Sequence, residues 1–262
     1  MFAQKTVLRL PAISSLVAML ATALVVSVVA AAVSEPAKTS AAAKAADLAA
    51  AAEDLVKSLE TTVSNATSFK QGEEEVERKG YVIALLANGV SESEGDAKWK
   101  ARALAVRDAA LGLAKSKGQP AADKALKDIK ALFGGGDAGK GEAKKYLDVS
   151  ELKYVMKEVN ERNKPMTKNL RGTNFARSKE SIARDAQVWA LLAAVARADT
   201  KSAQQAKKPQ ADFERYSDEF FTGAKSLAAA AGKGDQNAAS DALKAIRKAC
   251  ADCHAVFRPD IE

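Results

Sequence analysis

Apolar residues recur at three- and four-residue spacing along most of the chain, and this spacing predicts amphipathic helices. Four such stripes follow one another in the second half, within residues 152–159, 182–196, 213–227 and 239–257. Helix-breaking residues separate them, at Pro165 and Gly172, at Pro209, and at Gly232 and Gly234. Asp235 and Asn237 are the candidate caps of the last helix. Each stripe is the one-sided apolar face that a helix of a bundle needs.

The first half of the chain repeats this pattern. Residues 69–87 read FKQGEEEVERKGYVIALLA and residues 175–193 read FARSKESIARDAQVWALLA, an offset of 106. Residues 125–130 match residues 242–247 at an offset of 117, which implies an insertion of 11 residues near 200–209. We therefore predict an all-α fold of two four-helix bundles in tandem, related by internal duplication.

Changes in composition predict the boundaries of the parts. Residues 1–34 contain two basic residues, Lys5 and Arg9, followed by an apolar run from Ala12 to Val33. This pattern predicts a signal peptide or a membrane anchor. In either form this segment predicts export, to the periplasm or to the periplasmic face of a membrane. We expect the remaining parts to be a tether at 35–46, a first bundle at 47–133, a glycine-rich linker at 134–142 and a second bundle at 143–262.

Composition supports helices and excludes several classes of function. The chain is 47% hydrophobic but only 5% aromatic, which favours helices over sheet. The net charge is +7, yet no basic stretch is interleaved with aromatic residues, so we predict no nucleic-acid partner. The single histidine belongs to the C-terminal motif described below, which leaves none for a Ser-His-Asp triad. No phosphate-binding loop follows a strand either, so we predict that the protein is not an enzyme.

The candidate chemistry lies at the C-terminus, where Cys250, Cys253 and His254 form the sequence Cys-Ala-Asp-Cys-His. They are the only two cysteines and the only histidine of the chain. This spacing is typical of covalent attachment of a c-type haem, in which the two thiols add to the haem vinyl groups and the imidazole reaches the iron. We predict one covalent haem c per chain. The three residues continue the line of Leu243 and Ile246, which faces the bundle interior.

Three other interpretations of these residues are weaker. A structural zinc site needs four ligands, and the chain offers three thiol or imidazole groups that lie too close together for one tetrahedron. A dithiol redox site usually follows a strand of a βαβ unit, which the pattern here does not predict. A disulfide would close a very small loop and stabilise little. At an offset of 117 the three positions fall on Phe133, Gly136 and Asp137, so the first repeat lacks the haem ligands.

The C-terminal segment from Ile246 to Arg258, preceded by four predicted helices, resembles the class II cytochromes c, which comprise cytochrome c prime and its low-spin relatives. The resemblance covers residues 147–262 and is weaker in the first repeat. It implies a left-handed four-helix bundle, a covalent haem with His254 as proximal ligand, and periplasmic or membrane redox proteins as partners. Arg258 is then either close to the haem edge or an exposed cation at a helix end.

The sixth ligand of the iron separates two functions. Low-spin members carry a methionine on the first helix of the bundle, and Met156, in Leu-Lys-Tyr-Val-Met-Lys, stands at the matching place. Periodicity alone also allows Met156 to be a core filler beside Leu152 and Val159. Met166 is a weaker rival, because it follows Pro165 at an expected helix break. With Met156 as ligand we expect a one-electron carrier, and without it a five-coordinate protein that binds nitric oxide or another small gas.

A third hypothesis gives the haem a mainly structural role in the second bundle. The first repeat could dock on the second bundle, imitate a dimer partner or recognise a redox partner. Class II cytochromes often dimerise through their first two helices, so a homodimer and an intrachain pseudo-dimer both stay open. We expect Trp189 and Phe257 to be packing residues rather than electron relays.

Overall fold

The computed structural model describes residues 43–137, 141–142 and 144–258, and every regular element in these ranges is a helix. The all-α prediction is therefore confirmed. The helices are α1 (Ala45–Val63), α2 (Ala66–Glu92), the 3-10 turn η2 (Lys100–Arg102), α3 (Ala103–Ala114), α4 (Gln119–Gly134), α5 (Tyr146–Val149), α6 (Leu152–Asn169), α7 (Asn174–Arg197), α8 (Lys201–Ala206), α9 (Gln210–Lys233) and α10 (Gln236–Phe257).

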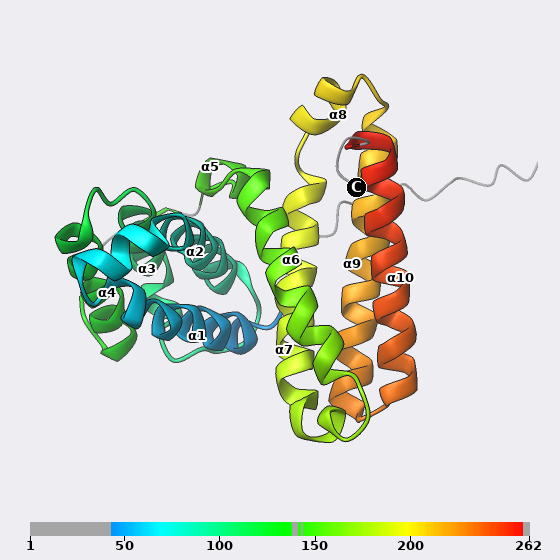
Figure 1. The fold of residues 1–262 in the computed structure, drawn as a ribbon, viewed down its shortest axis with the longest axis horizontal. Coiled ribbons are helices and arrows are strands. Elements are labelled where there is room, and N and C mark those ends of the chain that lie inside the picture. The colour runs from blue at the N-terminus through cyan, green and yellow to red at the C-terminus, as the bar shows by residue number, and fades with distance from the viewer. Residues whose placement is uncertain (1–42, 138–140, 143, 259–262) are drawn as a thin grey trace, which may run out of the picture. The chain divides into compact units, whose positions relative to one another are not determined.

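The first repeat consists of α1 to α4, which form a closed four-helix arrangement (Figure 1). α1 packs against α2, α2 against α3, α3 against α4, and α4 returns to α1. Alanines allow these helices to approach closely, and large apolar side chains fill the space between them, including Leu48, Leu59, Ile83, Leu113 and Ile129. These side chains belong to one continuous hydrophobic core that extends into the second repeat.

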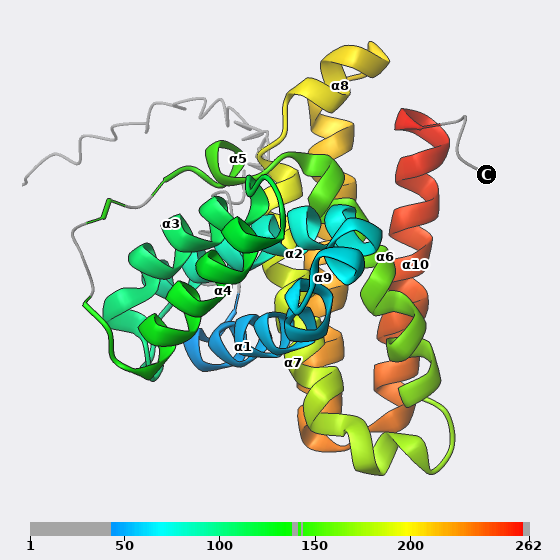
Figure 2. The same cartoon turned by 60° about the vertical axis from the view of Figure 1, so that its left-hand side comes forward.

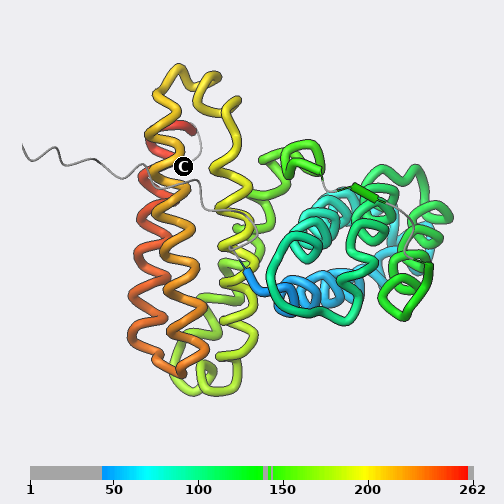
Figure 3. Tube along the Cα trace, turned by 180° about the vertical axis from the view of Figure 1, so that it is seen from behind, coloured from blue at the N-terminus to red at the C-terminus, as the bar shows by residue number. Residues whose placement is uncertain are grey.

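The second repeat is built on α6, α7, α9 and α10, with the short helices α5 and α8 added (Figure 3). α7 packs along α9 and α9 along α10, so these three helices form the most extensive part of the bundle. α9 and α10 come closest at Gly223, where an added Cβ would lie 2.6 Å from Cγ1 of Ile246. α6 packs on α7, and Arg247 of α10 bridges to α6 by donating to Oδ1 of Asn163 at 3.0 Å.

The sequence predicted a cap for the last helix and a helix break at Pro165, and the structure tests both. Asp235 caps α10, because its carboxylate accepts a hydrogen bond from the backbone N–H of Ala238 at 3.0 Å. The expected break at Pro165 is wrong, since α6 continues through it to Asn169. A proline inside a helix removes one backbone hydrogen bond and crowds the carbonyl four residues earlier, but the helix continues past Pro165 to its C-cap, where Leu170 N–H donates to the carbonyl of Met166 at 3.1 Å.

The two repeats contact each other through their first two helices, α1 and α2 against α6 and α7. Arg78 of α2 forms an ion pair with Glu158 of α6, and Arg184 of α7 forms one with Asp54 of α1 at 2.8 Å. Arg78 and Arg184 are equivalent residues at the offset of 106. Each arginine therefore crosses to the first helix of the other repeat, as in a two-fold interface, although the acceptors Glu158 and Asp54 are not equivalent at this offset.

The two repeats belong to one compact unit, which spans residues 35–262. The predicted signal or anchor at 1–34 and most of the tether at 35–46 lie outside the described residues, so these boundaries stay predictions, as does the division at 134–142. Among the helices that the structure describes, none is both long and apolar enough to cross a bilayer.

Candidate haem site

Cys250, Cys253 and His254 lie in the last two turns of α10. Ala239, Leu243 and Ile246 bury the preceding turns against the bundle, so the same face of the helix carries the two cysteines toward the interior. Both thiols are free and half-buried, whereas His254 is exposed. The local fold thus places the complete motif on one helix surface, as its spacing predicts.

All three residues line a cavity of about 160 Å³ that α10 shares with the facing helices. Apolar and aromatic side chains form most of its wall, with α6 contributing on one side and α9 on another. The residues that line it are Leu152, Met156, Val159, Ala196, Ser202, Phe213, Tyr216, Ser217, Phe220, Ala249, Cys250, Cys253, His254, Phe257 and Arg258.

Met156 lines this cavity from α6, and His254 lines it from α10. The structure therefore brings together all four residues that the sequence suggested for the cofactor. Met166 is different, because it is 1% exposed, belongs to the hydrophobic core and does not line the cavity. Of the two candidate methionines, only Met156 is in a position to face a cofactor held by α10.

The site suits a covalently held macrocycle. Burial raises the pKa of the Cys250 thiol and, together with Cys250, raises that of Cys253 to about 11, so both are protonated thiols near neutral pH. Partial burial and then the charge of Arg258 lower the pKa of His254, which favours the neutral imidazole that a metal ligand must be. Two thiols, a neutral imidazole and an apolar wall fit a haem c.

The comparison with protein families agrees with this chemistry. A family model described as cytochrome C′ matches residues 149–258. The second repeat belongs to the cytochrome c′ family. Its cofactor is accordingly a covalently bound haem c with its iron. Neither the search of curated proteins nor the search of solved structures gave a match.

Around the cytochrome c′ cavity, aromatic residues of α9 form a wall that the sequence did not assign to the site. Phe213, Tyr216 and Phe220 were predicted only as an apolar stripe, although three aromatics within eight residues stand out in a chain so poor in them. Phe213 packs edge-on against Phe257 with ring centroids 5.2 Å apart. Trp189, which is 1% exposed, meets the edge of Phe220 at 6.0 Å. Trp189 and Phe257 are thus packed, as predicted.

A second, more open hollow of about 590 Å³ adjoins the cavity on the Met156 side. The two spaces share Leu152, Met156, Ser202 and Arg258 in their walls. Arg258 is exposed at this place, close enough to His254 to affect its pKa. The Met156 side of the haem cavity therefore lies next to a solvent-accessible hollow.

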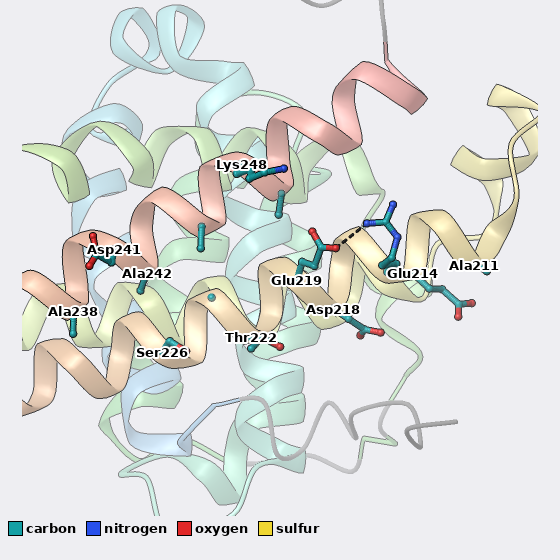
Figure 4. Close-up of a pocket in the computed structure, with 14 residues that line it drawn as sticks. Ala211, Glu214, Asp218, Glu219, Thr222, Ser226, Ala238, Asp241, Ala242 and Lys248 are labelled. Atoms are coloured by element: carbon teal, nitrogen blue, oxygen red, sulfur yellow. Dashed lines mark hydrogen bonds and ion pairs between the residues drawn. The ribbon is translucent and has the colours of Figure 1, made fainter. Parts of the chain in front are cut away.

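A larger hollow lies elsewhere, in a shallow groove between α9 and α10 (Figure 4). It encloses about 1040 Å³, and its floor consists of small side chains such as Ala242 and Ser226. At its rim Arg215 forms an ion pair with Glu219 at 2.8 Å. Neither a cysteine nor the histidine lines this groove, so it is not an alternative haem site despite its larger volume.

Proposed function

We propose that the protein is an exported monohaem electron carrier in which Met156 and His254 are the two axial ligands. The observation that supports this most directly is that both side chains line one cavity, from the facing helices α6 and α10. The haem, when bound, supplies an iron that takes up and releases one electron. A thioether opposite an imidazole favours the reduced state and so raises the potential.

Each part of the site has a separate task in this proposal. Cys250 and Cys253 would hold the haem through two thioethers and so fix its position relative to α10. His254 would bind the iron as the neutral imidazole, and Met156 would bind it from α6. Leu152, Val159 and Phe220 exclude water with apolar surface. With its one histidine used as a ligand, we propose that the protein transforms no substrate.

The second candidate function is binding of nitric oxide or another small gas at a five-coordinate iron. The hollow beside Met156 favours it, because a gas needs a path from solvent to the sixth-ligand side. The two candidates differ in one respect only, which is whether the sulfur of Met156 occupies that position in the reduced protein.

Replacing Met156 by alanine distinguishes the two functions. If Met156 is a ligand, the reduced M156A protein changes from a low-spin to a high-spin absorption spectrum. Met166→Leu is the matched control, because this methionine is buried away from the cavity, and its spectrum should equal that of the wild type. A spectrum that M156A leaves unchanged would support gas binding instead.

We propose the periplasm, or its membrane face, as the location, on the strength of residues 1–34 of the sequence. The partners are then periplasmic or membrane redox proteins, and the first repeat is an intrachain substitute for a dimer partner. Its reciprocal ion pairs, Arg78 with Glu158 and Arg184 with Asp54, support the latter. Light scattering of the purified protein should give a monomer, and a stable dimer would argue against the pseudo-dimer.

A further inference from the structure

Helix α6 lines the haem cavity with one face and contacts the first repeat with another. Leu152, Met156 and Val159 line the haem cavity. Residues at intermediate positions, Tyr154 and Glu158, contact α2 of the first repeat. Residues two apart on a helix point about 200° away from each other, so Met156 and Glu158 lie on nearly opposite sides of α6. Figures 1 and 2 both show α6 between α2 and α10. Whatever fixes one face of this helix therefore also fixes the other.

A buried ion network fixes the face toward the first repeat. Glu158 is 2% exposed, and its carboxylate accepts hydrogen bonds from Arg78 of α2 and, at 2.8 Å, from Arg162 of α6. Arg162 also forms an ion pair with Asp185 of α7. A buried carboxylate needs such partners, because an unpaired one would cost much free energy. Only Arg78 in this network comes from the first repeat.

Further contacts between α2 and α6 lie on both sides of this pair. The rings of Tyr81 and Tyr154 stack with centroids 4.5 Å apart and an interplanar angle of 25°. The Tyr154 hydroxyl donates to Oε1 of Glu77 at 2.5 Å, and Lys157 forms an ion pair with Glu74. These contacts span Tyr154 to Glu158, the same stretch of α6 that carries Met156 on its other side.

The second repeat by itself gives α6 less support. α6 packs along α7, but on the side toward α10 it borders the haem cavity instead of a neighbouring helix. The main bridge to α10 is Arg247, which reaches Asn163 and Thr167, about two and three turns beyond Met156. The position of the Met156 segment is thus set by α7 on one side and by the first repeat on another.

We propose that the first repeat positions α6 at the haem cavity and thereby sets how firmly Met156 occupies the sixth coordination position, with Arg78 as the positioning residue. This inference rests on the proposed ligation by Met156. The first repeat, which has no cysteine or histidine, would then influence the coordination of the haem held by the second repeat. Arg78 touches neither the haem cavity nor Met156 and acts only through Glu158.

Carbon monoxide binding to the reduced holoprotein tests the proposal, because the gas enters the sixth position only when the methionine leaves it. We expect Arg78→Ala to raise the rate of carbon monoxide binding roughly two- to thirtyfold, the range of energetic coupling that a single residue commonly carries. Arg78→Lys should restore most of the wild-type rate, because a lysine keeps the charge opposite Glu158. A purely structural arginine would change the melting temperature but leave this rate unchanged.

The matched control is Asp54→Ala, which removes the other reciprocal ion pair, between α1 and α7, without touching α6. Its carbon monoxide rate should stay at the wild-type value. Where Arg78→Ala fails to fold, the double variant Arg78→Met with Glu158→Met removes both charges of the link, and Arg162 keeps its ion pair with Asp185. The same acceleration is expected. An Arg78→Ala variant, or the double variant, whose rate matches that of Asp54→Ala would overturn the proposal.

The wild-type spectrum separates this test from that of the proposed function. A high-spin reduced wild type would refute ligation by Met156, and this inference, which rests on it, would be overturned as well. A low-spin wild type with no difference between Arg78→Ala and Asp54→Ala would overturn the positioning role alone. A low-spin wild type with faster gas binding in Arg78→Ala only is the result that supports both.

Discussion

Trp99 and Phe133 pack against each other in the first repeat with their ring centroids 4.9 Å apart and their planes tilted by 32°. At the offset of 117 these two residues correspond to Tyr216 and Cys250, both of which line the haem cavity of the second repeat. Trp99 is fully buried, and its indole N–H donates to Oε1 of Glu53 at 3.0 Å. At the two positions where the second repeat has residues that line its haem cavity, the first repeat thus has a packed aromatic pair.

Replacing Trp99 by alanine should therefore act on stability and leave the haem unaffected. We expect a loss of about 3–5 kcal/mol in the free energy of unfolding, as for other large buried aromatics. Urea unfolding followed by circular dichroism measures this loss. The absorption spectrum of the haem should stay unchanged in the same variant, and a changed spectrum would show that the pair does more than fill space.

The two cysteines should account for all covalent attachment. Haem should remain bound after denaturation in Cys250→Ala and in Cys253→Ala, each through one thioether, and should be lost in the double variant. Absorption of the denatured, reduced protein in pyridine distinguishes two thioethers from one. Met156→Ala is the control, because it should keep both thioethers. Haem retained by the double variant after denaturation would contradict the attachment.

A pair of glycines in α9 tests the packing of the haem-bearing helix. Gly223→Ala would place a Cβ 2.6 Å from Ile246, so α10 must shift, and we expect a loss of about 1–3 kcal/mol. Gly232→Ala meets nothing within 4 Å and should stabilise the helix by about 0.5–1 kcal/mol. Thermal unfolding of the two variants gives the comparison. Equal effects would mean that α9 and α10 are less closely packed than the structure shows.

The sequence was sufficient to predict the helices, the repeat and the residues of the motif, because each depends on local spacing. The apolar stripe alone placed Cys250 and Cys253 on the inner face of the last helix. Pro165 was misjudged because the loss of one hydrogen bond does not end a helix whose neighbouring turns are packed. The family resemblance suggested Met156 as a haem ligand. The structure adds that Met156 lines the cavity from α6, opposite the cysteines and histidine of α10.

The family resemblance allowed a contact through the first two helices of each repeat, but the residues that form it could not be predicted. Arg78 and Glu158 are 80 residues apart, and both looked like ordinary charges on helix surfaces until α2 and α6 were seen to meet. The aromatic pair of Trp99 and Phe133 was equally hidden, because its meaning depends on comparing the two folded repeats at equivalent positions. Long-range packing of this kind leaves no periodic trace in a single sequence.

The absorption spectrum of the reduced wild-type holoprotein, recorded with and without carbon monoxide, tests the central claim most directly. If Met156 and His254 both bind the iron, the reduced protein is low-spin, and carbon monoxide changes its spectrum slowly or incompletely because the thioether must first leave. A high-spin reduced spectrum that shifts at once on addition of carbon monoxide would contradict ligation by Met156 and identify a gas-binding protein instead.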